Sequence, residues 1–186
     1  MTRSSLRSLP LAAILLLASL GRAGLAATPP GSAAPSWPPS TALVVSELAT
    51  GGASASDEFV EIANVGAVAV DLAGLELVHA SASGATVARK VAWTLPTILE
   101  PGRRLLVANG GGIHAAVADA TYVDGLAATG GAVALRPVGG APIDALGWGD
   151  AANQYVEGAP APAPGAGESV ERLPGGLEGL SLIHIS

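Results

Sequence analysis

The chain has 186 residues, no cysteine, and three Trp, two Tyr and one Phe as its aromatic residues. This length suits one domain of ordinary size with tails, and the absence of cysteine excludes disulfides, cysteine-ligated metals and thiol catalysis. With 15 acidic and 9 basic residues, the net charge of −6 argues against a nucleic-acid binder, because such proteins present a basic face to the phosphates.

The first 26 residues have the pattern of an export signal. Arg3 and Arg7 form a short basic region, and residues 11–20 (LAAILLLASL) follow as an unbroken apolar run. That run is too short to span a bilayer, which needs about 20 residues, so the pattern favours a cleaved signal peptide over a membrane anchor. We predict cleavage after Ala26 and a mature protein that is secreted or held at the cell surface.

Residues 27–40 (ATPPGSAAPSWPPS) are rich in Pro, Ala and Ser. This composition predicts an extended linker without a core of its own. Trp37 is the exception within the linker, and its indole either docks on the following domain or stays exposed.

From Thr41 onward, short apolar runs alternate with Gly- and Pro-bearing turns, which favours an all-β sandwich or barrel. Residues 113–120 are the best helix candidate, with one or two turns at most. Residues 96–101 predict a turn, and residues 159–165 (APAPAPG) a polyproline-like loop. The predicted strands are residues 42–48, 58–64, 68–72, 75–79, 91–95, 103–108, 122–123, 132–136, 143–147 and 169–173.

Five segments, in this order, resemble a lamin tail domain, the immunoglobulin-like module of nuclear lamins and of many secreted bacterial proteins. They are LVVSELATG, DEFVEIANVGAVAVDLAGLELV, LEPGRRLLVANG, LAATGGAVALRPVGGAPIDALGWGD and GESVERLPGG. The resemblance places the domain at residues 41–176 and implies an immunoglobulin-like β-sandwich, but it implies no activity. Bacterial members of the family are usually joined to other domains, including nucleases and other hydrolases, or occur in cell-surface proteins.

The last seven residues, LSLIHIS (180–186), resemble the translation of a widely used transposon sequencing adaptor. We therefore expect residues 177–186 to be a truncated end, with further domains following Gly179 in the complete bacterial protein. We therefore assign no function to His184.

Asp57, Glu58 and Glu61 lie close together at the start of a predicted strand. They could form a cation site or an acid–base pair, or they could be a solvated loop end and an outward strand face. Calcium needs six to eight oxygen ligands, and this segment offers few, so we assign no metal and leave only a weak calcium site open. The resemblance implies structural roles for Glu58 and for Asn64, whose amide suits the turn at Val65 and Gly66.

His79 and His114 are the other candidates for catalysis, and each is isolated from other histidines in the sequence. A structural histidine is the favoured interpretation of both. No Gly-x-Ser-x-Gly elbow or H-x-x-x-H metal pair occurs, and no Lys-Ser/Thr follows the glycines at 110–112 to make a phosphate loop. We therefore predict no catalytic, cofactor-binding or metal-binding residues.

We predict that Trp93 and Trp148 pack in the core and do not form a sugar-stacking platform, because a core built mainly of Ala, Val and Leu needs large side chains. The basic pairs Arg89–Lys90 and Arg103–Arg104 predict solvated strand ends rather than a nucleic-acid patch, given the acidic balance.

Together these features predict a non-catalytic exported module that mediates interaction or attachment, with a protein or cell-surface component as its partner. The alternative is an accessory domain of a secreted nuclease, phosphoesterase or other hydrolase whose catalytic domain lies beyond the C-terminus. Downstream metal-binding clusters would favour the enzyme, and further β-modules or an anchor would favour the surface protein.

Overall fold

The computed structural model describes residues 40–172 and the backbone of residues 180–184. The predicted signal peptide, the predicted linker as far as residue 39, with Trp37, and residues 173–179 lie outside the described residues.

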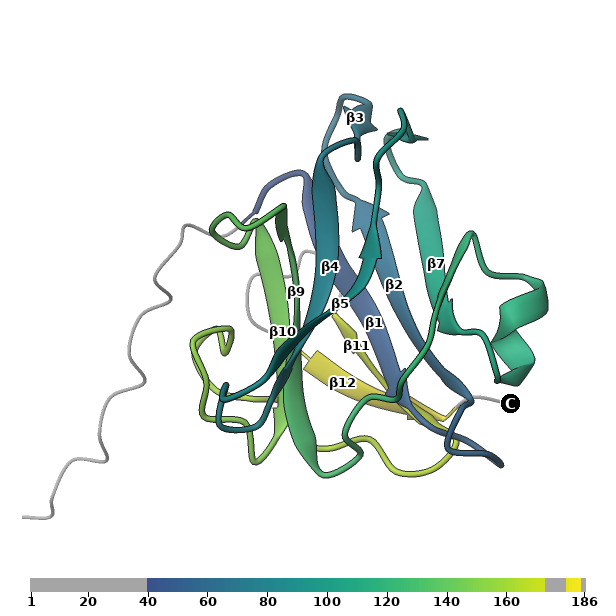
Figure 1. The fold of residues 1–186 in the computed structure, drawn as a ribbon, viewed down its shortest axis with the longest axis vertical. Helices are drawn as coiled ribbons and strands as arrows, with labels where there is room; N and C mark the ends of the chain where they lie inside the picture. The colour runs from purple at the N-terminus through teal and green to yellow at the C-terminus, as the bar shows by residue number, and fades with distance from the viewer. Residues whose placement is uncertain (1–39, 173–179, 185–186) are drawn as a thin grey trace, which may run out of the picture. The chain divides into compact units, whose positions relative to one another are not determined.

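Two β-sheets stack face to face, which confirms the predicted all-β, immunoglobulin-like sandwich (Figure 1). Among the described strands, all pair antiparallel except β7 and β8, which run parallel and are joined by a crossover that contains a short 3₁₀ turn, η1 (Ile113–Ala116). The larger sheet has the order β12 (Leu180–His184), β11 (Glu168–Arg172), β1 (Leu43–Thr50), β2 (Glu58–Asn64), β7 (Arg104–Asn109) and β8 (Ala120–Tyr122). The smaller sheet has the order β10 (Asp144–Gly149), β9 (Gly130–Pro137), β4 (Leu75–Ser81) and β5 (Val87–Ala92), and a separate pair consists of β3 (Val70–Asp71) and β6 (Ile98–Leu99).

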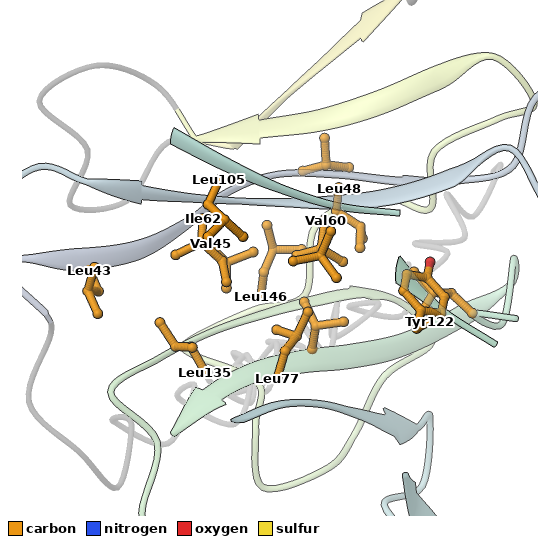
Figure 2. Packing of buried hydrophobic residues seen from close by; sticks show 14 of the residues in the cluster. Leu43, Val45, Leu48, Val60, Ile62, Leu77, Leu105, Tyr122, Leu135 and Leu146 are labelled. Carbon is orange, nitrogen blue, oxygen red and sulfur yellow. The ribbon is translucent and has the colours of Figure 1, made fainter. Parts of the chain in front are cut away.

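The core lies between the two sheets, where alternate side chains of each strand meet (Figure 2). Val60 and Ile62 of β2 face Leu77 of β4 and Leu135 of β9, and all four are fully buried. Trp93 and Trp148 belong to the same cluster, which confirms their predicted role in the core.

The β3–β6 pair corrects two predictions. Residues 68–72 form a strand only at Val70–Asp71, and Val68 is exposed. The predicted turn at 96–101 contains β6, which pairs with β3 through Val70–Leu99 and Asp71–Ile98. Two-residue strands carry too short a pattern to show period two, so only their pairing defines them.

The strand predicted at 91–95 is β5, which in the structure begins earlier, at Val87, and ends at Ala92. Its first four residues are partly or fully exposed and include Arg89 and Lys90, because β5 is an edge strand, so the apolar pattern there is weak. The predicted helix at 113–120 is reduced to the η1 turn, which covers only Ile113–Ala116.

The outer face of the smaller sheet is covered by residues 151–161, named here the covering segment. Tyr155 of this segment packs on the small side chains of that face, among them Ala80, Ala132 and Ala134. Ala161, in the predicted polyproline-like loop, forms a parallel bridge with Trp148 at the edge of β10.

Candidate functional site

The acidic residues 57, 58 and 61 do not converge on one site. Period two places Glu58 on the inner face of β2, beside Val60, and Glu61 on the outer face. Asp57 and Glu58 are each 2% exposed, so the expectation that they form a solvated loop end is wrong. Within residues 40–172, no three His, Asp or Glu side chains are grouped so that they could hold a metal ion.

Glu58 ties β2 to the far end of the parallel pair β7–β8. Its Oε1 accepts a hydrogen bond of 2.7 Å from the Leu126 amide, and its Oε2 accepts one of 3.0 Å from Asn109 Nδ2. The Tyr122 hydroxyl donates to the same Oε2 at 3.4 Å. Burial, followed by the charge of Glu58, raises the pKa of Tyr122 well above its usual range. The Glu58 carboxylate therefore holds three segments together, the structural role that the resemblance implied.

Asp57 and Glu61 also use their oxygens within the fold. Asp57 accepts backbone hydrogen bonds from Ser54 at 2.7 Å and from Ile113 at 3.1 Å, and these bonds lower its pKa below the ordinary value. Glu61 forms an ion pair with Arg104 and accepts a 2.7 Å hydrogen bond from Ser46 Oγ. Each carboxylate thus stabilises local structure.

Asn64 has the structural role that the resemblance implied. Its Nδ2 donates to the carbonyl oxygens of Val68 and Leu99, both at 2.8 Å, and its Oδ1 accepts from the Gly66 amide at 3.0 Å. The side chain is fully buried, so it supplies these main-chain groups with partners that water cannot provide. Asn64 thereby attaches the β3–β6 pair to the larger sheet.

Two buried carboxylates were missed by the sequence analysis. Glu76 lies on the outer face of β4, where it forms ion pairs with Arg89 at 2.6 Å and Arg136 at 2.8 Å and accepts from the Gly139 amide. Burial by itself would raise the pKa of Glu76, but the Gly139 amide and the two guanidinium groups outweigh it and hold that pKa below the usual value. The alternation of Leu75, Glu76 and Leu77 was a usable signal for its outward direction.

Asp144 of β10 is the second, and it links the two sheets. Its Oδ2 accepts a hydrogen bond of 2.7 Å from the Val45 amide of β1 and lies 3.2 Å from the Arg172 guanidinium of β11. Burial raises its pKa to about 6, although Arg172 and the Val45 amide oppose the shift. The sequence offers no local signal for this pairing, since Val45 precedes Asp144 by 99 positions.

The two histidines pack against different aromatic residues. His79 stacks on Trp148 with ring centroids 5.8 Å apart, and its buried Nε2 has no hydrogen-bond partner among the described residues. Burial and the nearby Lys90 charge lower the pKa of His79 to about 4, so its ring is neutral at pH 7. His114 meets the edge of Phe59 at 5.0 Å. Within residues 40–172, no carboxylate bonds to His79 to orient it as a general base.

The basic pairs are partly exposed, and they are also used within the fold. Arg103–Arg104 lies at the start of β7, as predicted, but Arg89–Lys90 lies in the middle of β5, so the prediction of a strand end is wrong for that pair. Arg89 pairs with Glu76, and Arg104 pairs with Glu61. Lys90 donates to the carbonyl oxygens of Asp124 and Gly125 and lies over the Tyr122 ring. Most of this positive charge is therefore compensated by the domain itself.

A pocket of about 540 Å³ lies between the end of β5 and the start of β7, and it is named here the β5–β7 pocket. Its apolar lining continues the core, through Val91, Trp93, Leu99 and Leu105. Its rim carries Glu100, Arg103, Arg104 and Asp119, with Thr97, Ile98, Ala92 and Ala120 completing the lining.

This geometry defines an immunoglobulin-like sandwich. Its buried polar groups form hydrogen bonds and ion pairs that connect its own strands. The family model of the Lamin Tail Domain matches residues 37–150, more than half of the chain, and the chain belongs to that family. The family consists of non-enzymatic immunoglobulin-like modules. The sandwich continues beyond the matched residues through β11, and the match begins at Trp37.

The search of curated proteins found no match to this chain. In the part of the chain that the structure describes, no helix is long and apolar enough to cross a membrane.

Proposed function

We propose that this chain is a non-catalytic binding module of an exported bacterial protein and that it attaches that protein to another protein or to a cell-surface component. The observation that carries the proposal is the β5–β7 pocket, a hollow with apolar core residues and charged side chains in its lining, beside the strongly exposed side chains of Ile98 and Leu95. Concave apolar sites with a few polar groups at the rim are where proteins bind ligands. The family contributes a non-enzymatic module, which agrees with this role.

Export rests on the N-terminal pattern of a basic region, an apolar run and small residues before the predicted cleavage site. The test is to express the intact chain in a bacterium and to measure the mass of the product outside the cytoplasm. We expect a mature chain that begins at Ala27. An Ala26→Arg variant should keep its full length, because signal peptidase requires a small residue there. A full-length wild-type chain that stays in the cytoplasm would contradict export.

Attachment can be tested with cell envelopes of the organism that carries the gene. The labelled chain is mixed with the envelopes and sedimented, with protease-treated envelopes as a parallel sample. We expect saturable retention, and its loss after protease treatment would identify a protein partner. No retention, or retention that rises without saturation, would contradict the proposed function.

A further inference from the structure

We infer that the β5–β7 pocket binds an extended polypeptide segment of a partner protein, which adds as a strand to the outer edge of β7. This inference rests on the proposed function as a binding module and names its site and the form of its partner. The segment carries a bulky apolar side chain for the pocket and, next to it, a carboxylate for Arg103.

The first argument is an unpaired length of strand edge. In the described residues, β8 pairs with β7 only along Val107–Asn109, so the first half of β7 has no strand on its outer side. Leu106, the residue before this paired stretch, donates its amide to the Asp119 carboxylate and accepts at its carbonyl from the Asp119 amide. Between Leu106 and the start of β7 at Arg104, the outer edge of β7 has no partner strand among the described residues.

Main-chain alternation identifies Arg104 as the open position. The Asn64 amide donates to the Arg103 carbonyl, while the Arg103 amide donates to the Glu100 carbonyl. The Arg103 carbonyl and, by alternation, the hydrogen-bonding groups of Leu105 therefore face β2. The N–H and C=O of Arg104 therefore point away from β2, toward the pocket that this residue lines. An added strand satisfies such groups, as in β-strand addition.

The second argument is the pocket beside that edge. Val91, Leu99 and Leu105 form an apolar surface that continues the core, and Ile98 at the rim is 55% exposed. A strand on β7 would direct alternate side chains into this hollow. The site therefore suits one bulky apolar residue, which would supply affinity, while the backbone of Arg104 would supply direction.

The third argument is charge. Arg103 lines the pocket and is exposed, and its side chain has no ion pair or hydrogen bond to the described residues. Its neighbour Arg104 is already paired with Glu61, and the Asp119 carboxylate on the same rim is engaged by the Leu106 amide. Glu100 on the same rim also has no ion pair to the described residues, so the carboxylate of the incoming segment is assigned to the Arg103 side of the rim, away from Glu100.

The neighbouring strand edge is not available for the same purpose. Leu77 pairs with Val91 and Val78 pairs with Arg89, so Lys90 is an extra residue that bulges out of β5. A bulge and a lysine on an edge strand both discourage further pairing. The incoming strand is therefore assigned to β7.

The test uses the full chain and a library of displayed random peptides about eight residues long, which span roughly 26 Å when extended. Peptides retained by the wild type are assayed against Ile98→Asp and Arg103→Glu, with Ile113→Asp as the matched control. Ile113 is also strongly exposed, but it lies on η1, outside the pocket lining. We expect dissociation constants about tenfold higher for the two pocket variants and unchanged for the control.

Two further measurements separate strand addition from simple apolar contact. N-methylation of alternate peptide amides should abolish binding at one parity and leave it intact at the other, because only alternate amides face β7. The Arg104 amide should exchange hydrogen more slowly in the complex, while the Leu105 amide, which faces β2, should not change.

Several outcomes overturn the inference. Peptides that bind Ile98→Asp and Arg103→Glu as well as they bind the wild type would place binding elsewhere, and saturable envelope retention would then still support the proposed function. Binding that is insensitive to the parity of N-methylation would overturn strand addition. A library from which the wild type retains no peptide would overturn the inference as a whole. Both pocket variants change exposed side chains, and a melting temperature equal to that of the wild type verifies their folding.

Discussion

The two edges of the smaller sheet are protected in different ways. At β10, the chain's own covering segment closes the edge: Ala161 donates to the Gly147 carbonyl and accepts from the Gly149 amide, both at 2.8 Å. At β5, no strand covers the edge within the described residues, and a charged bulge at Lys90 discourages pairing instead. One edge is covered by the chain itself and the other is protected by a bulge and a charge, so binding is expected at the neighbouring open edge of β7.

Sequence composition accounts for the difference. The end of the covering segment and the residues just after it have Pro at every second position, at Pro160, Pro162 and Pro164, which leaves few N–H groups for a further strand. The residues of β5 keep their N–H groups and use Arg89 and Lys90 for protection. The predictions below test whether the covered edge is structural and whether the side with the pocket is free for binding.

The largest expected effect is at the covered edge. Trp148 is fully buried, and its Nε1 donates to the Ala127 carbonyl at 2.9 Å. Trp148→Ala should lower the free energy of unfolding by about 3–5 kcal/mol, through lost burial and a residual cavity. Urea unfolding measures this loss. Leu95→Ala, at an exposed position, is the control and should stay within about 0.5 kcal/mol of the wild type.

The next effect concerns the side that carries the β5–β7 pocket. Glu58→Gln keeps the shape of the side chain but removes the charge that three donors share, so we expect a loss of about 2 kcal/mol in unfolding free energy. Glu61→Gln is the matched control on the outer face of the same strand. It should cost less than about 1 kcal/mol, because its ion pair with Arg104 is partly exposed. If both variants lost the same unfolding free energy, the buried hydrogen bonds of Glu58 would stabilise the domain no more than the partly exposed ion pair of Glu61.

A smaller effect tests the hydrogen bonds of the covering segment. Ala161→Pro removes the N–H that bonds the Gly147 carbonyl and should lower the unfolding free energy by about 1 kcal/mol. Ala163→Pro changes an exposed position in the same Pro-rich sequence and serves as the control. If the two variants unfold at the same urea concentration, the bridge to β10 does not stabilise the domain.

The last prediction concerns the dependence of stability on pH, through the titration of His79 and Asp144. The pKa of His79 is lowered to about 4 in the fold, so the unfolded chain binds its proton first and stability falls as pH drops from about 6.5 toward 4. The pKa of Asp144 is raised to about 6, so its contribution has the opposite sign: stability falls as pH rises through about 4 to 6.

Melting temperatures between pH 4 and 7 measure both contributions. His79→Gln should remove the acid-dependent loss, and Asp144→Asn should remove the loss on the alkaline side. Unchanged pH profiles in both variants would show that neither group is buried as the structure places it.

Most strands were predictable because their side chains alternate around a buried face and end at Gly, Pro or Asn. Val60 and Ile62 mark the inner face of β2 by period two alone, and Asn64 before Val65 and Gly66 marks its end. Trp93 and Trp148 were predictable as core residues because few other large side chains are available. Strand faces, strand ends and core aromatic residues can be predicted because each depends on residues only a few positions away in the sequence.

The roles of the carboxylates were harder to predict. Period two placed Glu58 on the inner face, yet a buried carboxylate is costly unless donors surround it. Its donors Asn109, Tyr122 and Leu126 follow it by 51, 64 and 68 positions. Glu76 depends in the same way on Arg136, which comes 60 residues later.

The all-β sandwich, its core-facing residues and most of its strands follow from the sequence alone, because period two and turn chemistry are local properties. Which carboxylates are buried and which sheet edge is covered become visible only in the folded domain. The same holds for the short β8, which leaves the first residues of β7 without a strand on their outer side, next to a pocket. Those features depend on hydrogen-bond partners and packing between strands that are distant in the chain, and no local pattern encodes that pairing.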